Sequence, residues 1–536
     1  MPSLELPSPS RRLCALMLSV ALAGCTDPVS SEREPVPTIR GDSTPLLVGS
    51  GRTFSAVGPV AWSVNGIPGG SAEVGTVDAD GHYVAPLLLP TAEPVAITAT
   101  VAGGQASDTV RLALTPAPLE GDWYGYQPRV IRVDRTAPVL LTVHAMPPVT
   151  RVVLAYKDGG EAELARRGGQ LFQTAIPAAK ALSLYTPGEA RNHVGFIDYY
   201  AGNVLTARVN AFVNVLDADV PAVALASLAA DAQASDHVLN LRWDGHMTPT
   251  STDDVARRAY QLLPDDYDFM AMVWPTSMTQ NRYFSIVRND TRGIGLGTID
   301  NGPTFGSAAR LQGTIQFPID GMFDLGAPVA SHEIGHRWIN HLRHPALRAG
   351  GAHWPIGDVA SGIMGFSIAG SGAGGTFHFR IDSTAPWEYR LVAQQPDHRF
   401  NMLELYLMGL AAPAEVPGFF VFSDQNPGDR LRDGGILRGT VRKLTVDSLV
   451  AVDGPRIPAA GEAQREFRLA TVVLSVGRLL TADEMTFFSH MARRGEATVP
   501  LLYRDGFVVE TGLPFTLATR GRATLTTHLG RGPTGM

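Results

Sequence analysis

Lysine and cysteine are nearly absent from this sequence, and the chain has no excess of positive charge. Only Lys157, Lys180 and Lys443 among the 536 residues carry an ammonium group, and the formal net charge is −7. This balance provides no field that would attract nucleic acid, so we expect no nucleic-acid partner. Hydrophobic residues make up 45% and charged residues 18% of the chain, which is typical of globular proteins and not of disordered ones.

The apolar run in "RRLCALMLSVALAGC" (residues 11–25) is too short to stay in a bilayer as a spanning helix. A basic pair precedes it and small residues follow it, which indicates an export signal. Its last four residues, ending at Cys25, resemble the lipobox of bacterial lipoproteins. The resemblance implies cleavage before Cys25, a lipid on its thiol, and a lipoprotein of the outer membrane or cell surface. An ordinary secretory signal is the alternative. Cys14 would leave with the signal, so we expect neither a disulfide nor a thiolate metal site.

Composition and turn residues divide the rest of the chain. Residues 1–25 are the expected signal, and residues 26–44, rich in Pro, Ser, Glu and Thr, predict a flexible tether. Residues 45–116 show short alternating runs broken by turn pairs such as Asn65-Gly66, which predicts a small β-sandwich. With "WSVNG" and "GTVDADGHYVAP", this stretch resembles bacterial Ig-like domains.

Residues 117–216 continue with the same texture. Runs such as "RVVLAYK" and "LTARVNAFVNV" are strand-length and rich in β-branched or aromatic residues. The segment "DYYAGN" (residues 198–203) resembles a turn of fibronectin-type and Ig-like modules. We therefore predict a second Ig-like or fibronectin-like sandwich, and for both sandwiches a role as spacers or adhesive modules.

The character changes in residues 217–536, where strand patterns come first and helical patterns come later. "DDYDFMAMVW" and "RLQGTIQF" are typical of buried strands, whereas "HRFNMLELYLMGLAA" and "TADEMTFFSHMARR" indicate helices. Thr481 and Glu484 have the spacing of a capping box. Because βαβ alternation is missing, we predict an α+β domain. The whole chain is then two all-β sandwiches followed by an α+β domain.

The sharpest chemical motif is His332-Glu333-x-x-His336, within "APVASHEIGHRWINHLRH" (residues 327–344). Residues four apart in a helix lie on nearly one face, so His332 and His336 can bind one Zn²⁺ together. Glu333 lies about 100° round the helix. From there its carboxylate can reach a zinc-bound water and act as the base that activates it.

Zinc needs a third protein ligand, and two candidates remain open. The metzincin pattern would place Gly at 339 and His at 342, but this chain has Ile339 and Leu342. His353 follows a glycine-bearing loop and precedes Met364 in "GIMGF", which resembles the methionine turn under metzincin zinc sites. We favour His353 on this ground. Glu404, on a later helix, is the alternative and would match the arrangement of thermolysin-like enzymes.

Other polar residues are weaker candidates. A continuous helix would turn His341 and His344 away from the metal. Tyr389 and Tyr406 are candidates for stabilising charge in a transition state, and each is more often simply a packed residue. The glycine-rich "GIGLGTIDNG" (residues 293–302) is where we look for a sheet edge that could bind a peptide as an added strand, with a turn of no function as the alternative.

Segments from "YDFMAMVW" through "HEIGHRWINHL" and "HWPIGDVASGIMGF" to "ATRGRATLTTHL" resemble a family of secreted bacterial zinc metallopeptidases, over about residues 220–530. The resemblance implies hydrolysis of peptide bonds in a protein or peptide substrate. It implies His332 and His336 as zinc ligands and Glu333 as base. A non-catalytic surface adhesin that retains this scaffold is the second hypothesis. The intact Glu333 favours the enzyme, and the tandem sandwiches favour the adhesin.

Overall fold

The computed structural model describes residues 37–71, 73–86, 90, 94–101, 103, 106–115, 122–243, 252–275, 282–308, 310–318, 323–368, 374–504 and 509–530. The expected signal with Cys25, and residues 26–36 of the expected tether, lie outside these residues. Within them, no helix combines the length and the apolar character needed to cross a membrane.

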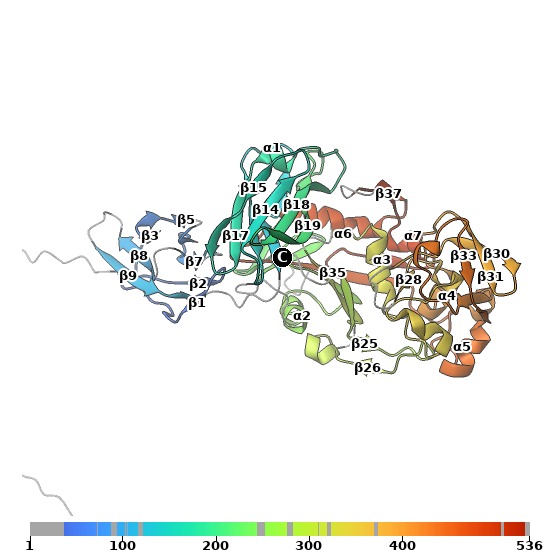
Figure 1. The fold of residues 1–536 in the computed structure, drawn as a ribbon. Coiled ribbons are helices and arrows are strands. Elements are labelled where there is room, and N and C mark those ends of the chain that lie inside the picture. The colour runs from blue at the N-terminus through green and yellow to red at the C-terminus, as the bar shows by residue number, and fades with distance from the viewer. Residues whose placement is uncertain are drawn as a thin grey trace, which may run out of the picture.

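Residues 46–115 form a β-sandwich at one end of the molecule, drawn in blue (Figure 1). Its two four-stranded sheets enclose Phe54, Trp62, Tyr83 and Ile97. The alternation seen in the sequence is the alternation of inward and outward side chains. The first sheet is β2 (Gly51–Thr53), β7 (His82–Val84), β6 (Gly75–Val77) and β5 (Gly70–Ser71), the second is β4 (Ile67–Pro68), β3 (Val60–Val64), β8 (Val95–Val101) and β9 (Ser107–Leu112), and β1 (Leu46–Leu47) pairs with β10 (Leu114–Thr115).

A second sandwich follows, with its own core around Leu141, Val152, Phe172 and Ile197. Its larger sheet contains the long hairpin of β18 and β19. Both N-terminal units are thus Ig-like β-sandwiches. The smaller sheet is β11 (Trp123–Gln127), β13 (Val139–His144), β17 (Leu171–Ile176) and β16 (Ala165–Gly168), the larger is β12 (Val130–Arg132), β19 (Val204–Leu216), β18 (Arg191–Ala201), β14 (Arg151–Tyr156) and β15 (Glu161–Glu163), and α1 (Ala178–Ala181) follows β17.

The C-terminal part is built on one mixed sheet. Its four central strands, β22, β35, β23 and β27, run parallel, and β24 is an antiparallel edge strand. The domain is therefore mixed α/β, which differs from the α+β arrangement that the sequence predicted. The strand order is β20 (Ala226–Ala229), β21 (Ala232–Ala234), β22 (Val238–Arg242), β35 (Glu466–Ser475), β23 (Phe269–Val273), β27 (Gly313–Phe317) and β24 (Tyr283–Ile286), with β38 (Thr524–Thr526) paired to β35.

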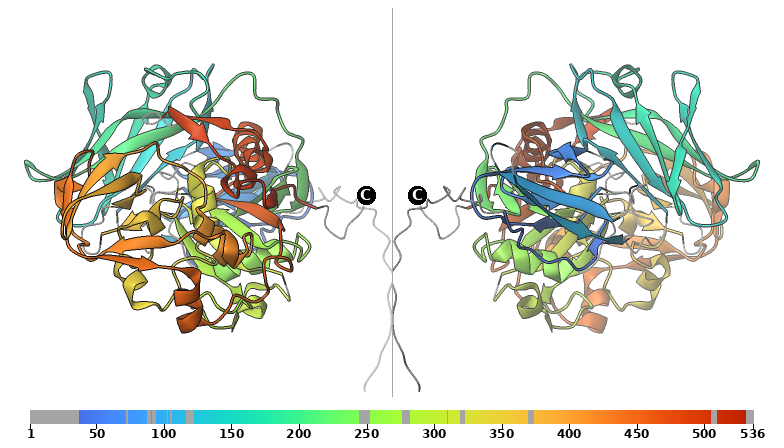
Figure 2. Two further views of the ribbon diagram at one scale, coloured as in Figure 1. Left: turned by 90° about the vertical axis from the view of Figure 1, so that its right-hand side faces the viewer. Right: turned by 90° about the vertical axis from the view of Figure 1, so that its left-hand side faces the viewer.

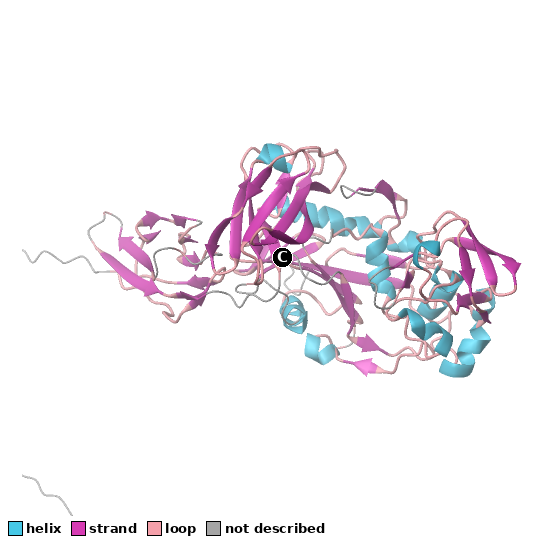
Figure 3. Ribbon diagram, in the orientation of Figure 1, coloured by secondary structure: helices cyan, strands magenta, loops and turns pink. Residues whose placement is uncertain are grey.

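Both faces of this sheet are covered. On β23, Phe269, Ala271 and Val273 join the core that also holds α3, whereas Met270 and Met272 join the core on the α2 side. Burial on both faces explains why this strand is an unbroken apolar run. The helices are α2 (Thr252–Tyr260), α3 (Pro328–Gly335), α4 (Met402–Met408), α5 (Val446–Asp453), α6 (Ala482–Arg493) and α7 (Phe515–Ala518) (Figure 3).

Short elements surround the sheet, and Figure 2 shows them from both ends of the molecule. The glycine-rich residues 293–302 supply only β26 of a two-stranded ladder, so the edge of the main sheet is β24 and not this segment. The ladders are β25 (Arg288–Asn289) with β26 (Ile299–Asp300), β28 (Phe366–Ser367) with β29 (Gly374–Gly375), β30 (Phe379–Ala385) with β31 (Glu388–Ala393) and β33 (Ile436–Arg438), β32 (Phe419–Phe422) with β34 (Val441–Leu444), and β36 (Leu501–Arg504) with β37 (Val509–Gly512). The 3₁₀ turns are η1 (Gly302–Phe305), η2 (Pro345–Gly350), η3 (Asp358–Ala360), η4 (Pro413–Glu415), η5 (Gly428–Arg430) and η6 (Arg494–Glu496).

A buried arginine joins the second sandwich to the C-terminal sheet. The Arg129 guanidinium donates to the carbonyl oxygens of Leu474 (2.5 Å) and Trp274 (2.6 Å), at the ends of two central strands. Its backbone N–H donates to Glu484 Oε1 (2.8 Å). Glu484 also accepts from both terminal nitrogens of Arg478 (2.7 and 2.9 Å) and caps α6 together with Thr481, as its spacing predicted. The second sandwich is therefore bonded into the domain that follows it.

Replacement of Glu484 by Gln should weaken this junction in a pH-dependent way. Burial raises the pKa of Glu484, but Arg478, Thr481 and the Arg129 amide together lower it further, so the net pKa lies below the ordinary value. Its charge thus stabilises the fold above the unfolded-state pKa of about 4.3, and this contribution is lost as pH falls through the folded-state pKa. We expect Glu484→Gln to lower the free energy of unfolding by about 3 kcal/mol near neutral pH.

Urea denaturation of the wild type and the variant, near neutral pH and near pH 3, checks this expectation. Glu466→Gln, at an exposed position of β35, is the matched control and should change little. A Glu484→Gln effect of equal size at both pH values would show that its charge is not what holds the junction.

Candidate metal centre

The helix that carries the motif is shorter than the sequence predicted. Pro328 stands in its first turn after the extended Ala327, and His336 is already its C-cap residue. His336 keeps right-handed helical dihedral angles (φ −58°, ψ −14°), so the turn from His332 to His336 is preserved. The two imidazole ring centroids lie 4.9 Å apart.

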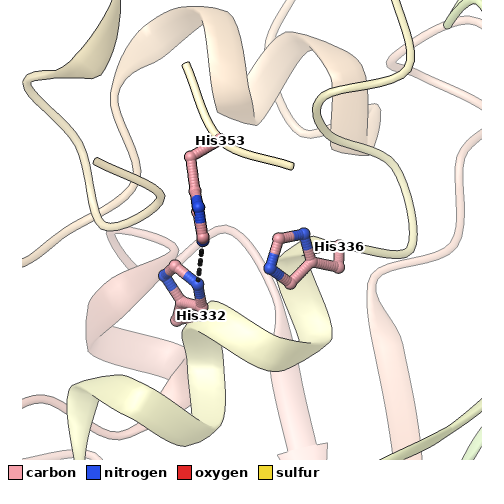
Figure 4. Close-up of side chains that lie close together, drawn as sticks. All are labelled: His332, His336 and His353. Atoms are coloured by element: carbon pink, nitrogen blue, oxygen red, sulfur yellow. Dashed lines mark hydrogen bonds between the residues drawn. The ribbon is translucent and has the colours of Figure 1, made fainter. Parts of the chain in front are cut away.

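His353 brings a third imidazole to this pair. It lies between η2 and η3, and its ring centroid is 5.1 Å from that of His332 and 5.3 Å from that of His336. One nitrogen from each ring lies within 4.8 Å of the others (Figure 4). Of the two candidates for a third ligand, the structure brings His353 to the motif. We call His332, His336 and His353 the three-histidine cluster.

A backbone carbonyl fixes the orientation of His332. Its Nδ1 lies 2.9 Å from the carbonyl oxygen of Ile363. Burial lowers the pKa of His332 to about 4, although the bond to Ile363 raises it, so the ring is neutral near neutral pH. Because a carbonyl oxygen only accepts, Nδ1 carries the proton and Nε2 presents its lone pair. That Nε2 lies 3.1 Å from Nε2 of His353.

The donor atoms, spacing and protonation of the three-histidine cluster fit a zinc ion. Three neutral imidazoles are a donor set that zinc accepts in catalytic sites, with a fourth position left for water or substrate. Nitrogen ligands at about 2.0–2.1 Å from a tetrahedral zinc lie roughly 3.3 Å from each other, close to the spacing of His332 and His353. Burial is the main cause that lowers the pKa of His336 and His353 as well, so protons compete weakly for these nitrogens.

The segment after His353 packs under the motif helix. Met364 follows the carbonyl that orients His332, and its side chain lies against Gly335. A Cβ added at Gly335 would meet Met364 Sδ at 2.5 Å and the Phe400 ring at 2.9 Å. Gly335 therefore permits this close approach.

Glu404, the alternative third ligand, is engaged elsewhere. It lies in the first turn of α4 and shares a capping box with Asn401. Its Oε1 accepts from Trp354 Nε1 (2.9 Å), and its Oε2 accepts from the Asn401 amide (2.9 Å). Trp354 is the residue directly after His353, so Glu404 holds the loop that carries the third histidine. Burial raises the pKa of Glu404 to about 7.

Glu333 is buried beside the cluster, with 6% of its surface exposed. Burial raises the pKa of its carboxyl to about 7, and the positive charge of Arg282 opposes the rise. Arg282, directly before β24, also lowers the pKa of His332. Sequence reasoning did not single out Arg282, whose only signal was a basic residue at the start of a predicted strand.

The remaining candidates lie in other surroundings. His341 Nε2 is 3.0 Å from the His336 carbonyl oxygen, and His344 caps η2 through Nδ1. The Tyr406 hydroxyl accepts from the Arg456 amide, and the Tyr389 ring packs edge-on against Phe422. His341 and His344, which the sequence argued against as ligands, lie outside the three-histidine cluster.

The similarity of this chain to known proteins is weak. No family model matches the sequence, and no curated protein matches it. Among solved structures, titin domains Z1Z2 in complex with telethonin are 20% identical, with 34% of this chain and 96% of that chain covered and a TM-score of 0.11. The four N-terminal Ig domains of Dscam1 are 10% identical (48% and 62% covered, TM-score 0.12). The human desmocollin-1 ectodomain is 9% identical (77% and 78% covered, TM-score 0.13). Scores this low carry no argument about the metal centre.

Removal of the His353 imidazole tests its place in the centre. We expect His353→Ala to lower zinc affinity by more than about 100-fold, because even the loss of partners outside the ligand shell costs about 10–100-fold. Competition titration with a chromogenic chelator measures the affinity. His344→Ala is the matched control and should bind zinc like the wild type. If Glu404→Gln loses zinc and His353→Ala does not, the assignment is reversed.

Proposed function

We propose that this chain is a zinc-dependent metallopeptidase that hydrolyses peptide bonds, and that its mixed α/β domain is zincin-like. The observation that carries the proposal is the three-histidine cluster with a buried carboxyl, Glu333, on the same helix. A binding protein would need the imidazoles but would have no use for a base next to them.

Each residue of the centre has a defined task in this proposal. His332, His336 and His353 would hold the zinc ion, and the Ile363 carbonyl would keep the His332 ring turned so that Nε2 faces it. Zinc bound in such a site polarises a carbonyl group and makes water more acidic.

Glu333 would take the proton from the attacking water. A pKa near 7 leaves a large fraction of this carboxyl ionised at neutral pH and still lets the acid form return a proton to the leaving amine. Arg282 shifts the balance toward the ionised form because its charge lowers the pKa of Glu333. Burial keeps bulk water from competing for the proton.

Glu333→Gln separates catalysis from metal binding. We expect one zinc per chain to remain bound, while cleavage of casein falls by about 100-fold to 10,000-fold, the range that a general base contributes. Zinc content is measured by atomic absorption, and cleavage by release of labelled peptides. Glu73→Gln, in the first sandwich, should keep full activity.

The second candidate function, a surface adhesin, is favoured by the two Ig-like sandwiches. If wild type and Glu333→Gln are equally inert at stoichiometric zinc, the adhesin replaces the peptidase. Loss of zinc from Glu333→Gln would contradict the task that we give to this residue.

We also propose that the protein is exported and anchored in a membrane by a lipid on Cys25. The support is the sequence "LAGC" after an apolar run. A diacylated chain partitions stably into membranes. We expect the wild type to incorporate labelled palmitate and to sediment with membranes. Cys25→Ser should lose both properties, and the Cys14→Ser control should keep them. A Cys25→Ser protein that still carries palmitate would rule out this anchor.

A further inference from the structure

A second polar site lies at the end of the motif helix, away from the three-histidine cluster. It is a cavity of about 320 Å³ lined by residues around the start of β23, the start of β35 and the turn after His336. Two of its lining side chains are buried guanidinium groups, those of Arg337 (1% exposed) and Arg456 (7% exposed). Buried cations need compensating negative charge, so their partners decide what the cavity can bind.

The partners of Arg337 are mostly neutral. Its guanidinium donates to the side-chain oxygens of Asn289 (2.7 Å) and Gln312 (3.1 Å). Its nearest carboxylate contact among the described residues is Asp290 at 3.7 Å, whose side chain is 84% exposed. An ion pair of that length with a solvated carboxylate compensates little of the buried charge.

The hydrogen-bond partners of Arg456 are all neutral in the described part of the chain, and the exposed Asp290 carboxylate also acts on its charge. Its guanidinium donates to the main-chain carbonyl oxygens of Leu407 (2.8 Å), Met408 (3.0 Å) and Pro458. A guanidinium has five N–H donors, so both arginines retain donors beyond these contacts. Burial lowers the pKa of each to about 10, and both therefore stay charged at neutral pH.

The other charged residues around the cavity do not supply the negative charge that the two buried arginines lack. Asp268 accepts from Arg310 (3.2 Å), Gln312 and Gln464, so its carboxylate is already engaged. The cavity wall also includes Glu462, which lies at the exposed rim. Of the three carboxylates that line the cavity, buried Asp268 is therefore already paired with Arg310, and Asp290 and Glu462 are exposed to solvent.

We propose that this cavity binds a small oxyanion, a carboxylate or a phosphate group, through Arg337 and Arg456. Guanidinium groups bind both kinds of oxyanion with paired, charge-assisted hydrogen bonds. The cavity is large enough for such a group with accompanying water. Because Arg337 directly follows His336, the bound anion would also brace the end of the helix that carries the cluster. This inference does not depend on the peptidase proposal, since binding needs neither zinc nor cleavage.

Calorimetric titration of the zinc-free full chain with inorganic phosphate, and separately with acetate, tests the proposal. We expect saturable binding at one site, and the anion that binds more tightly identifies the preferred group. Asp290→Asn removes a competing carboxylate at an exposed position and should tighten binding about threefold. Glu161→Gln, an exposed position in the second sandwich, should leave the affinity unchanged. His353→Ala should also leave it unchanged, which distinguishes this cavity from the cluster.

Arg456→Lys keeps one charge but removes the forked donors, and we expect at least a tenfold loss of affinity. If that variant does not fold, Asp290→Asn alone decides. The proposal is overturned if neither anion binds in a saturable manner, or if Asp290→Asn binds no more tightly than the wild type.

Discussion

The three-histidine cluster depends on one packing constraint, the approach of residues Ile363 and Met364 to the motif helix. The Ile363 carbonyl sets the His332 ring, and Met364 lies against Gly335, where a side chain would collide. The loop that ends in these two residues begins near His353 and is held by the bond from Trp354 to Glu404. One well-packed segment therefore supplies one histidine of the cluster, orients another and packs against the helix that carries both His332 and His336. Because Trp354, Met364 and Gly335 are buried, the cluster is positioned by contacts in the interior of the domain.

The sequence could predict the part of the three-histidine cluster that helix periodicity sets. Spacing alone puts His332 and His336 on one face, and this held even though the helix stops at Gly335. The sequence favoured His353 over Glu404 as the third ligand because a segment that resembles the methionine turn of metzincins follows His353. The structure brings His353 to the motif and turns Glu404 toward Trp354. Ile363 acts through its backbone, which every residue shares, so no side-chain pattern could reveal it.

The fold could be predicted where one strand pattern repeats locally and not where distant segments meet. Alternation and turn pairs located both sandwiches, and the capping box located α6 at Thr481. The parallel order of the C-terminal sheet was not predicted, because β35 enters between β22 and β23 from a distant part of the chain, and Asn240 of β22 is 233 positions from its partner Val473. Likewise, a spacer was expected of the second sandwich, yet Arg129 is bonded to the ends of two central strands. A lone arginine in a β-rich stretch carries no sign of a partner 345 positions later.

The late position of β35 has a consequence for biosynthesis. As the chain emerges from the ribosome or from a translocation pore, the sandwiches can close early, since their strand pairs are local. The mixed sheet cannot, because its central strand β35 is synthesised long after β22 and β23, and until then the edges of these two strands lack their shared neighbour. Assembly of the histidine-bearing half must therefore wait until β35 has been synthesised, and a nascent chain that stalls before residue 466 exposes unpaired strand backbone to chaperones and proteases.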